Sequence, residues 1–400
     1  MTHLRVGFFT EIYRPVVNGV VTSVDTLAEG LRSRGHEVYC FAPSMPGATR
    51  SDGSVFRLPS LPLPTATPYR LTLPLVGRRN VNNVIKRLAL IHVHSLFVTG
   101  WAGLRYARRY GMPIVYTYHT QLEAYAHYVP FEPNATRFAA AQLTRTFGNL
   151  VDAVVVPTPA VARHLRELGV EVRIDVVPTG IDVDHFGAGK RDERLRRRLG
   201  VRAGGRLVLF VSRLAREKNV EVLLHALAGA NDRTLTLVIA GDGPQREELE
   251  RLAADLRVAD QVVFLGVIAR SDLPDLYASA DAFVFPSTTE TQGLVQAEAL
   301  AAGAFVVAAD TPPNRDVLGD AARIVAPTRE AFARALREIP AAPDARTAQR
   351  AKAAALRFSA VRQVDAMVEL YLDLLDPSRT IRGGRDRSGH LDGTNIRSIS

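Results

Sequence analysis

Short apolar runs rich in β-branched residues alternate with stretches of helical periodicity along nearly the whole chain, and this alternation limits its fold most. Near the N-terminus, the runs "LRVGFFT" (4–10) and "HEVYCFAP" (36–43) flank an amphipathic segment at 21–35. A strand, a helix and another strand in this order form a parallel pair joined by a right-handed crossover. The sequence therefore predicts the α/β class with parallel sheets.

The alternation occurs in two series, separated by the Gly- and Pro-containing stretch 176–191. We expect residues 1–180 and 181–358 to form two Rossmann-like domains that face a central cleft, because parallel sheets bind ligands beyond the carboxyl ends of their strands. Residues 359–376 are expected to form a helix that crosses back to the first domain. Residues 377–400 are rich in Gly, Ser and Arg with almost no apolar periodicity, and are expected to be disordered.

Composition excludes several classes of protein. The apolar runs are too short to span a bilayer, and the N-terminus lacks the pattern of a signal peptide. A single cysteine, Cys40, excludes an intramolecular disulfide and a cysteine-based zinc cluster. The formal net charge of +9 favours anionic partners. No nucleic-acid-binding signature accompanies this charge, so we expect a protein that does not bind nucleic acid. The lone cysteine fits a reducing cytoplasm, which is the expected location.

Polar residues follow predicted strands at two places in the first half. Asn18 and Gly19 lie where a strand gives way to a helix, so amide groups there can bind an anion or simply form the turn. His119 directly follows the apolar run "PIVYTY" and is expected to point into the cleft. His92 and His94, in the run "HVH", are expected to face opposite sides of their strand.

In the second half, Arg213 and Lys218 follow the apolar run "LVLFV". Two cations five residues apart can bind a diphosphate, with the arginine bidentate and the lysine as a point charge, or can both be solvated. No metal site is expected. The spacing of His119 and His127 fits neither usual helical pair of ligands, and the acidic pair in "DVD" (182–184) lies in the linker, where a structural role is favoured.

Glu290 and Glu298 are separated by seven residues, the first after the strand "AFVFPS" and the second on the following helix. Two such acids can hold a metal, act as acid and base, bind sugar hydroxyls or solvate a helix. Carboxylates accept hydrogen bonds from hydroxyls, and the helix N-terminus near Gly293 and Leu294 would stabilise a phosphate. This order of hydroxyl, phosphate and hydroxyl suits a nucleotide-sugar.

These motifs resemble those of the retaining family-four glycosyltransferases, which have the GT-B fold. The matching stretches are "NGV" near the N-terminus, "YHT", "SRLAREKN", "GDGP", "ETQGLVQAE" and "ALAAGAFVVA". The resemblance covers about residues 3–375. It implies transfer of a hexose from a nucleotide diphosphate-sugar to a hydroxyl acceptor, with retention of the α configuration and without a metal or other cofactor.

The resemblance also implies roles for individual residues. Glu290, the first glutamate of the motif, contacts the donor sugar, and Glu298 contacts the ribose. Arg213 and Lys218 bind the diphosphate, and His119 contacts the donor sugar near the reacting carbon. The other donor-binding positions are Asn18, Gly19, Thr291, Gln292, Gly293 and Leu294. Since no protein nucleophile is evident, we expect front-face attack assisted by the leaving phosphate.

Within the family, "TETQGL" and "YHTQLEAYAHY" are most similar to bacterial enzymes of the α-monoglucosyldiacylglycerol synthase type, so a membrane lipid is the expected acceptor. The basic, partly apolar stretch 68–90 is the expected surface for peripheral contact with the inner face of the cell membrane. Its cations are Arg70, Arg78, Arg79, Lys86 and Arg87. Alternatively, its helix packs Val81, Val84, Ile85 and Leu88 on the sheet and leaves a solvated basic edge.

Three alternatives remain on the same architecture. A transferase acting on a soluble small molecule or polysaccharide would use the same donor site. A non-hydrolysing nucleotide-sugar epimerase would need no acceptor, and a binding protein would hold the donor without turnover.

Overall fold

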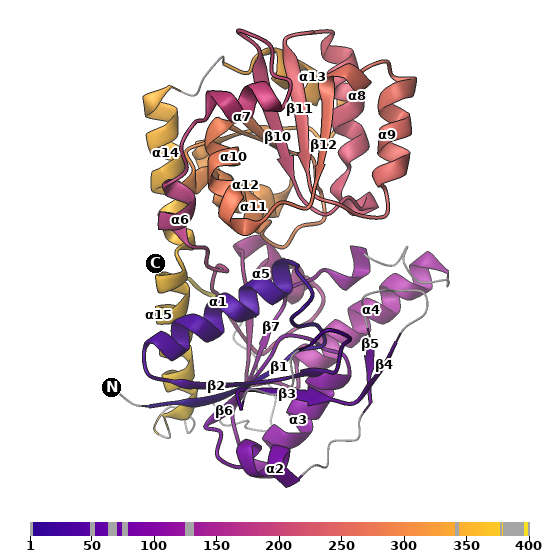
Figure 1. The fold of residues 1–400 in the computed structure, drawn as a ribbon. Coiled ribbons are helices and arrows are strands. Elements are labelled where there is room, and N and C mark those ends of the chain that lie inside the picture. The colour runs from indigo at the N-terminus through magenta and orange to yellow at the C-terminus, as the bar shows by residue number, and fades with distance from the viewer. Residues whose placement is uncertain are drawn as a thin grey trace. The chain divides into compact units, whose positions relative to one another are not determined.

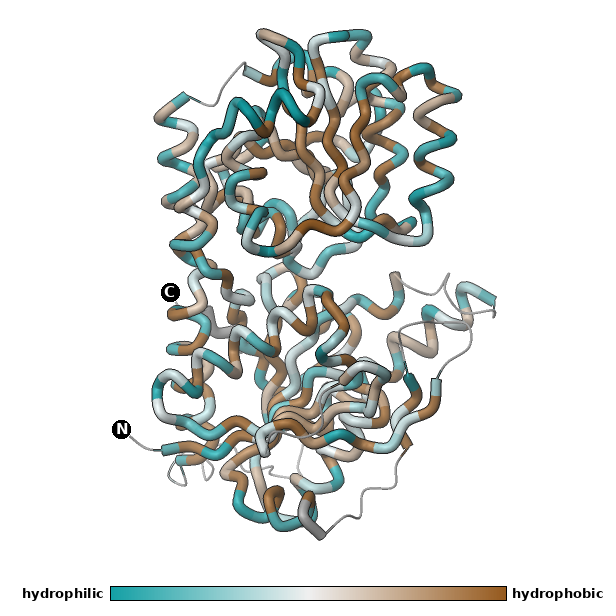
Figure 2. The backbone as a smooth tube through the Cα atoms, in the orientation of Figure 1, coloured by the Kyte–Doolittle hydropathy of each residue, from teal (hydrophilic) through white to brown (hydrophobic). Residues whose placement is uncertain are grey.

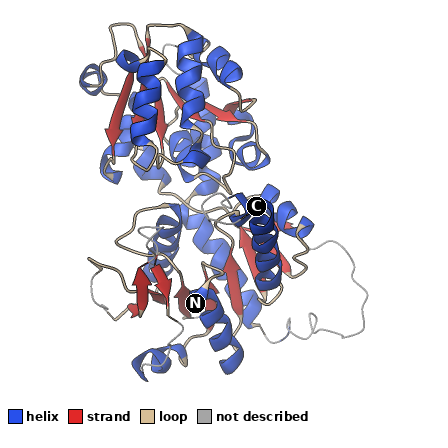
Figure 3. Ribbon diagram, turned by 90° about the vertical axis from the view of Figure 1, so that its right-hand side faces the viewer, coloured by secondary structure: helices blue, strands red, loops and turns tan. Residues whose placement is uncertain are grey.

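The computed structural model describes residues 3–48, 53–62, 70–73, 79–124, 132–340, 344–376, 378 and 396–398. The chain divides into two compact units, here called unit 1 (residues 1–180 and 360–400) and unit 2 (residues 181–359). In both units, helices cover the two faces of a parallel sheet (Figures 1 and 3).

The sheet of unit 1 has the order β16-β9-β8-β7-β6-β1-β2-β3 within the described residues, and every neighbouring pair is parallel. Its strands are β1 (Arg5–Phe9), β2 (Glu37–Pro43), β3 (Val55–Leu58), β6 (Leu90–Val93), β7 (Ile114–Thr117), β8 (Ala153–Val156), β9 (Arg173–Val176) and β16 (Ile396–Ser398). The helices of this unit are α1 (Gly19–Ser33), α2 (Arg79–Ile85), α3 (Val98–Tyr110), α4 (Pro133–Gly148), α5 (Pro159–Glu167) and α15 (Ala360–Leu375).

Alternating side chains of these strands form two apolar layers. Val6 and Phe8 of β1 pack in one cluster with α1 and with Val364 and Met367 of α15. Phe9, the next residue along β1, packs in the other cluster, with residues of α2, α3 and α5. This alternation follows from the two-residue period of a strand. It also assigns any polar side chain on these strands to one of the two faces.

In unit 2, the described residues form a six-stranded parallel sheet of order β12-β11-β10-β13-β14-β15. Its strands are β10 (Arg206–Val211), β11 (Leu235–Ala240), β12 (Val262–Gly266), β13 (Ala282–Phe285), β14 (Val306–Ala309) and β15 (Ala322–Val325). The helices are α6 (Val183–Gly187), α7 (Glu193–Arg198), α8 (Val220–Ala230), α9 (Arg246–Asp255), α10 (Leu273–Ser279), α11 (Leu294–Ala301), α12 (Pro312–Leu318), α13 (Arg329–Arg337) and α14 (Ala345–Ala355).

The central strands β10 and β11 of unit 2 are mostly apolar, as Figure 2 shows, with Arg206 and Thr236 as their polar residues. All six residues of β11 are buried. Strands covered on both faces are continuous apolar runs rather than alternating ones, which is why these segments stand out in the sequence.

Some elements were not identified from the sequence. The Pro-rich stretch 43–74 contributes the edge strand β3 and the antiparallel hairpin of β4 (Ser60–Pro62) and β5 (Arg70–Thr72). Pro62 ends β4, which is an edge strand of a two-stranded sheet, and proline is tolerated on edge strands. Of the tail expected to be disordered, the structure describes Ser378 and the short strand β16, which pairs with β9. The remainder of that prediction lies outside the described residues.

Candidate active site

The carboxyl ends of β10 and β13 bring together residues from two loops that are far apart in sequence. These strands are neighbours in the sheet, but the chain leaves β10 toward β11 and leaves β13 toward β14. Their junction is therefore a topological switch point, the place where loops diverge and open α/β sheets bind ligands. The short helix η2 (Arg216–Lys218) follows β10, and residues 286–293 join β13 to α11.

An ion pair joins the two loops. Nζ of Lys218 lies 2.5 Å from Oε1 of Glu290, and each side chain is only 14% exposed. The hydroxyl of Ser287 also donates to Oε1 of Glu290, at 2.7 Å. Asn219 reinforces the junction, because its Nδ2 donates to the carbonyl of Pro286. Lys218 and Glu290, which the sequence indicated separately, are thus in direct contact at the switch point.

Arg213 lies on the same loop as Lys218. Its guanidinium donates to Oε1 of Glu217 at 2.6 Å, and its side chain is 47% exposed whereas that of Glu217 is buried. Each cation of the pair is thus accompanied by a carboxylate. The charges of these four groups cancel, so an anion bound here needs further stabilisation.

The N-terminus of α11 offers such stabilisation. Gly293 precedes the helix with a φ of 75°, and a Cβ at this position would lie 2.4 Å from Nε2 of Gln296. Only glycine adopts this conformation without strain. The amide groups that follow Gly293 belong to the first turn of a helix and point away from its body, where the helix dipole favours an anion.

Thr291, Gln292 and Leu294 surround that glycine. Thr291 and Leu294 are partly buried, whereas Gln292 is buried. The carbonyl of Gln292 accepts a hydrogen bond from Nε2 of Gln296. Gln292 therefore helps to fix the loop through its backbone.

Glu298 belongs to a separate cluster on α11. Its side chain is 5% exposed, Tyr277 donates its hydroxyl to Oε2 at 3.1 Å, and Arg270 lies 3.5 Å from Oε1. Burial raises the pKa of Glu298, and the charge of Arg270 and the Tyr277 hydrogen bond oppose that rise. The guanidinium of Arg270 also lies over the ring of Phe186. Glu298 is thus held by α10 and by the segment that follows β12, whereas Lys218 and Glu290 contact each other directly.

Sequence reasoning missed a buried amide network beneath the loop. Asn314 is fully buried and donates to the carbonyls of Ala309 and Ser287, while its Oδ1 accepts from Gln296. Asn314 lies three residues after Thr311, the N-cap of α12, and the side chain of Thr311 accepts a hydrogen bond from the backbone N–H of Asn314. The signal available in the sequence was a polar residue at a helix start that directly follows an apolar strand.

In unit 1, Asn18 and Gly19 form the start of α1. Oδ1 of Asn18 accepts from the backbone N–H of Val21, so Asn18 is the N-cap, and Gly19 is exposed. The side chain of Asn18 thus caps the helix, whereas the backbone amide of Gly19 lies at an exposed helix N-terminus.

His119 follows β7 and lies beside a second histidine. Its Nε2 is 3.1 Å from Nδ1 of His94. The residue is partly buried, and desolvation by the surrounding chain lowers the pKa of His119 to about 4. The prediction that His92 and His94 face opposite sides is wrong, since their ring centroids are 4.1 Å apart. Residues two apart on a strand share a face. His127 lies outside the described residues.

The proposed membrane stretch is only partly described. The guanidinium of Arg70 donates to the hydroxyl and carbonyl of Ser60, Lys86 and Arg87 are exposed, Arg78 lies outside the described residues, and the side chain of Arg79 is not described. Val81, Ile85 and Leu88 are buried in the core, with Val84 packed against them, as the packing alternative predicts. None of the described helices is both long and apolar enough to cross a bilayer.

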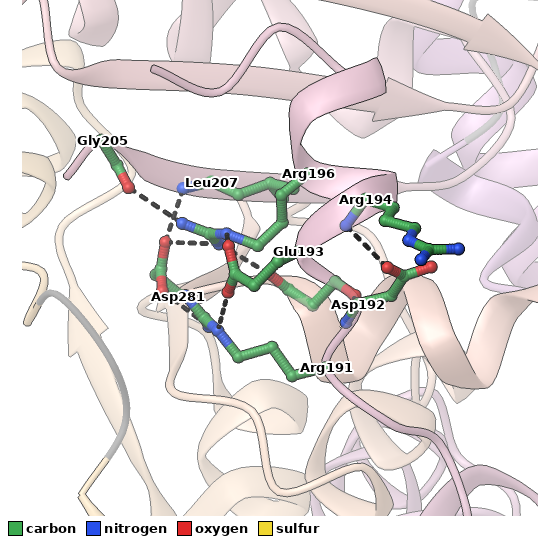
Figure 4. Close-up of polar contacts among 9 residues, drawn as sticks. Arg191, Asp192, Glu193, Arg194, Arg196, Gly205, Leu207 and Asp281 are labelled. Carbon is green, nitrogen blue, oxygen red and sulfur yellow. Dashed lines mark hydrogen bonds and ion pairs between the residues drawn. The ribbon is translucent and has the colours of Figure 1, made fainter. Parts of the chain in front are cut away.

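The basic run 191–200 has a structural role (Figure 4). Arg196 donates to Oδ2 of Asp281 at 2.9 Å and to the carbonyls of Ser279 and Gly205. Arg191 forms an ion pair with Oδ1 of Asp281, also at 2.9 Å. These arginines therefore anchor the start of unit 2 to the sheet.

The acidic run 182–184 is also structural in part. Oδ1 of Asp182 accepts from the backbone N–H of His185, so Asp182 is the N-cap of α6. Within the described ranges, His, Cys, Asp and Glu side chains form no group of three that could hold a metal ion.

Comparison with known proteins follows this division of the chain. The family model described as "Glycosyltransferase Family 4" matches residues 17–185, and the model described as "Glycosyl transferases group 1" matches residues 191–356. The α-monoglucosyldiacylglycerol synthase of Streptococcus pneumoniae is 34% identical over 330 residues, which cover 79% of this chain and 74% of that protein. A GDP-mannose-dependent α-mannosyltransferase of Mycobacterium tuberculosis is 34% identical over 331 residues, covering 80% and 82%.

Solved structures show the same fold. The crystal structure of Anabaena HepE in complex with UDP has a TM-score of 0.72 and 20% sequence identity, and covers 92% of this chain and 100% of that one. Sucrose-phosphate synthase from Thermosynechococcus elongatus has a TM-score of 0.74 and 21% identity, with 93% and 99% covered.

Proposed function

The chain belongs to glycosyltransferase family 4 and has the GT-B fold, and from this premise we propose that it transfers a hexose from a nucleoside diphosphate-sugar to a hydroxyl of a diacylglycerol-type lipid. The transfer retains the α configuration and needs no metal. In this proposal, unit 2 binds the donor and unit 1 binds the acceptor.

The observation that carries the donor assignment is the Lys218–Glu290 pair at the switch point. An ammonium group has three N–H donors, so Lys218 can keep one on Glu290 and offer two to phosphate oxygens. The described contacts of Glu290, from Lys218 and Ser287, are both to Oε1, so Oε2 is the oxygen that would accept from a sugar hydroxyl. One pair of side chains would thereby bind phosphate and sugar together.

Electrostatic stabilisation of the leaving diphosphate is the main catalytic contribution in this proposal. Lys218, the half-exposed guanidinium of Arg213 and the first amides of α11 surround the place where negative charge develops as the glycosidic bond breaks. The leaving phosphate oxygen accepts the proton of the acceptor hydroxyl on the same face of the sugar. Gly19 and Asn18 assist in donor binding, and His119 contacts the transferred sugar.

Glu298 would contact the ribose from the other side of α11. Its buried carboxylate is held by Tyr277 and Arg270, so a ribose hydroxyl would have to share it with these donors. A hydrogen bond to a charged group contributes about 1.5–3 kcal/mol.

The lipid acceptor is supported by the relatives and by surface chemistry. Proteins named α-monoglucosyldiacylglycerol synthase from two bacteria are 34% and 32% identical to this chain. In unit 1, Leu61 and Leu71 pair across the β4–β5 hairpin and are 54% and 46% exposed. Together with the exposed Lys86 and Arg87, these leucines would favour an anionic membrane surface.

A donor screen tests the proposed function. UDP-glucose, UDP-galactose and GDP-mannose would be incubated with the full chain, with and without diacylglycerol vesicles, and nucleotide release measured. We expect release that depends on the lipid, together with a glycolipid whose anomeric configuration is α by NMR. Release without any acceptor would indicate epimerisation or hydrolysis, and a β-linked product would contradict retention.

A soluble acceptor is the second candidate, because mannosyltransferase relatives are as similar as the S. pneumoniae glycolipid synthase. Co-sedimentation with neutral and anionic vesicles distinguishes the two. Negligible binding to both would remove the membrane surface from the proposal.

A further inference from the structure

His119 is backed by a row of buried polar side chains on one face of the unit 1 sheet. His92 on β6 and His94 just beyond it lie two positions apart, as do Thr117 at the end of β7 and His119 just beyond it. The two strands are parallel neighbours, with His92 in register with Val115. The period of the strands therefore directs these side chains toward α15.

The inner part of this row is fully hydrogen-bonded. Nδ1 of His92 lies 2.6 Å from the hydroxyl of Tyr371 on α15, and its Nε2 lies 2.7 Å from Oγ1 of Thr117. Phe8 of β1 contacts both His92 and His94 edge-on, with ring centroids 5.3 Å and 4.7 Å away. Packing and hydrogen bonds on this inner side thus leave the ring of His94 little freedom to turn.

The outer part of the row is the contact between His94 and His119. Nδ1 of His94 lies 3.1 Å from Nε2 of His119, and the rings are stacked with centroids 5.3 Å apart. Burial lowers the pKa of both imidazoles, so both are neutral at pH 7. One of the two facing nitrogens therefore carries the proton and the other accepts it.

The far nitrogen of His94 indicates which one donates. Nε2 of His94 is buried and has no hydrogen-bond partner within the described part of the chain. If it carried the proton, an N–H group would be buried without an acceptor, and such orphaned donors are rarer than unsatisfied acceptors. The proton of His94 therefore belongs on Nδ1.

We propose that His94 is a positioning residue for glycosyl transfer, whose Nδ1–H donates to Nε2 of His119 and fixes His119 as the Nδ1–H tautomer. His119 then presents a hydrogen-bond donor, rather than a base, at its other nitrogen. This inference rests on the proposed function only in that His119 contacts the transferred sugar. The tautomer itself is a property of unit 1.

The tautomer can be observed without any substrate. In the intact protein labelled with 15N-histidine, long-range 1H–15N spectra distinguish Nδ1–H from Nε2–H imidazoles, and the signals of His119 are identified by their loss in His119→Asn. We expect the Nδ1–H tautomer in the wild type and in His94→Asn, whose amide nitrogen can replace Nδ1. In His94→Leu, the Nε2–H form should increase.

His36 provides the matched control. It is buried in the same unit, where its Nδ1 accepts from the backbone N–H of Leu4, so His36→Leu also removes a buried imidazole. We expect this variant to lose thermal stability without changing the tautomer of His119. A shift in both His94→Leu and His36→Leu would indicate general loosening and would overturn the proposal.

Turnover completes the test. With the donor found in the screen, kcat of His94→Leu should fall about tenfold, the value of one hydrogen bond, with little change in KM, and His94→Asn should restore most of it. An Nε2–H tautomer in the wild type, an unchanged tautomer in His94→Leu, or a wild-type kcat in that variant would each overturn the proposal. If the wild type turned over no donor, the proposed function would fail, whereas the spectra would still decide the tautomer.

Discussion

Removal of the buried carboxylate of Asp281 should destabilise unit 2 substantially. The side chain is fully buried and accepts from the backbone N–H of Leu207 at 2.7 Å and from Arg196 at 2.9 Å, with Arg191 as a second cation. In Asp281→Asn the guanidinium of Arg196, only 6% exposed, would lose its buried counter-ion and keep only the exposed carboxylate of Glu193, 3.4 Å away. Breaking such a pair costs about 3–5 kcal/mol.

We expect a loss near the lower end, about 3 kcal/mol, because Arg196 keeps the carbonyls of Ser279 and Gly205 as acceptors. For a unit of this size, an m-value of about 2 kcal/mol per M of urea converts this loss into a midpoint lowered by about 1.5 M. The double variant Asp281→Asn/Arg196→Met should recover part of the loss, because it removes the unpaired cation as well.

The assay can separate the two units, because the single tryptophan of the chain, Trp101, lies in unit 1. Urea unfolding would be followed by far-UV circular dichroism, which reports both units, and by Trp101 fluorescence. We expect the first signal to shift more than the second.

Asp260→Asn is the control, since its pair with Arg233 is more than half exposed on both sides and should contribute less than about 1 kcal/mol. The reasoning would be refuted if Asp281→Asn lost no more stability than this control, or if the double variant were as unstable as the sum of its two single variants.

Three further predictions concern the site. Lys218→Met and Glu290→Gln should each lower kcat/KM for the donor by about 10²-fold or more, measured by nucleotide release, and activity within threefold of wild type would contradict the donor assignment. Gly293→Ala should raise the donor KM, because its Cβ would displace the start of α11, whereas Gly204→Ala, also at positive φ but with no atom within 4 Å of its Cβ, should leave KM unchanged. Burial lowers the pKa of the histidines at 92, 94 and 119 in the folded chain. Below pH 6.5, these histidines therefore bind protons in the unfolded chain but remain neutral in the folded chain. The free energy of unfolding of unit 1 should therefore be highest above that pH and should fall by about 1.4 kcal/mol per histidine at pH 5.5. Urea unfolding followed by Trp101 fluorescence at a series of pH values would measure this fall, and an unfolding free energy independent of pH would refute the burial argument.

Local sequence determined the elements that carry the site. The apolar runs that became β10 and β13 are buried on both faces, so their composition alone identified them as central parallel strands. Because polar residues directly after such strands lie at the ligand-binding edge of the sheet, Lys218 and Glu290 could be selected before their contact was known.

Contacts between distant segments were decided only by the tertiary structure. The Lys218–Glu290 pair depends on β10 and β13 being neighbours, and strand order is not encoded in any local period. The position of Asn314 at a helix start was visible in the sequence, but Asn314 and Tyr277 bind partners on other elements, and no sequence spacing indicated those partners.

The histidines at 92 and 94 lie between these two cases. Their shared face follows from the strand period and was available in the sequence, whereas their partners at 117, 119 and 371 required the fold. Periodicity is a property of consecutive residues, and the sequence therefore determined which side chains lie on which face. Pairing across the sheet is a property of the whole packed chain, and only the tertiary structure decided which of those side chains meet.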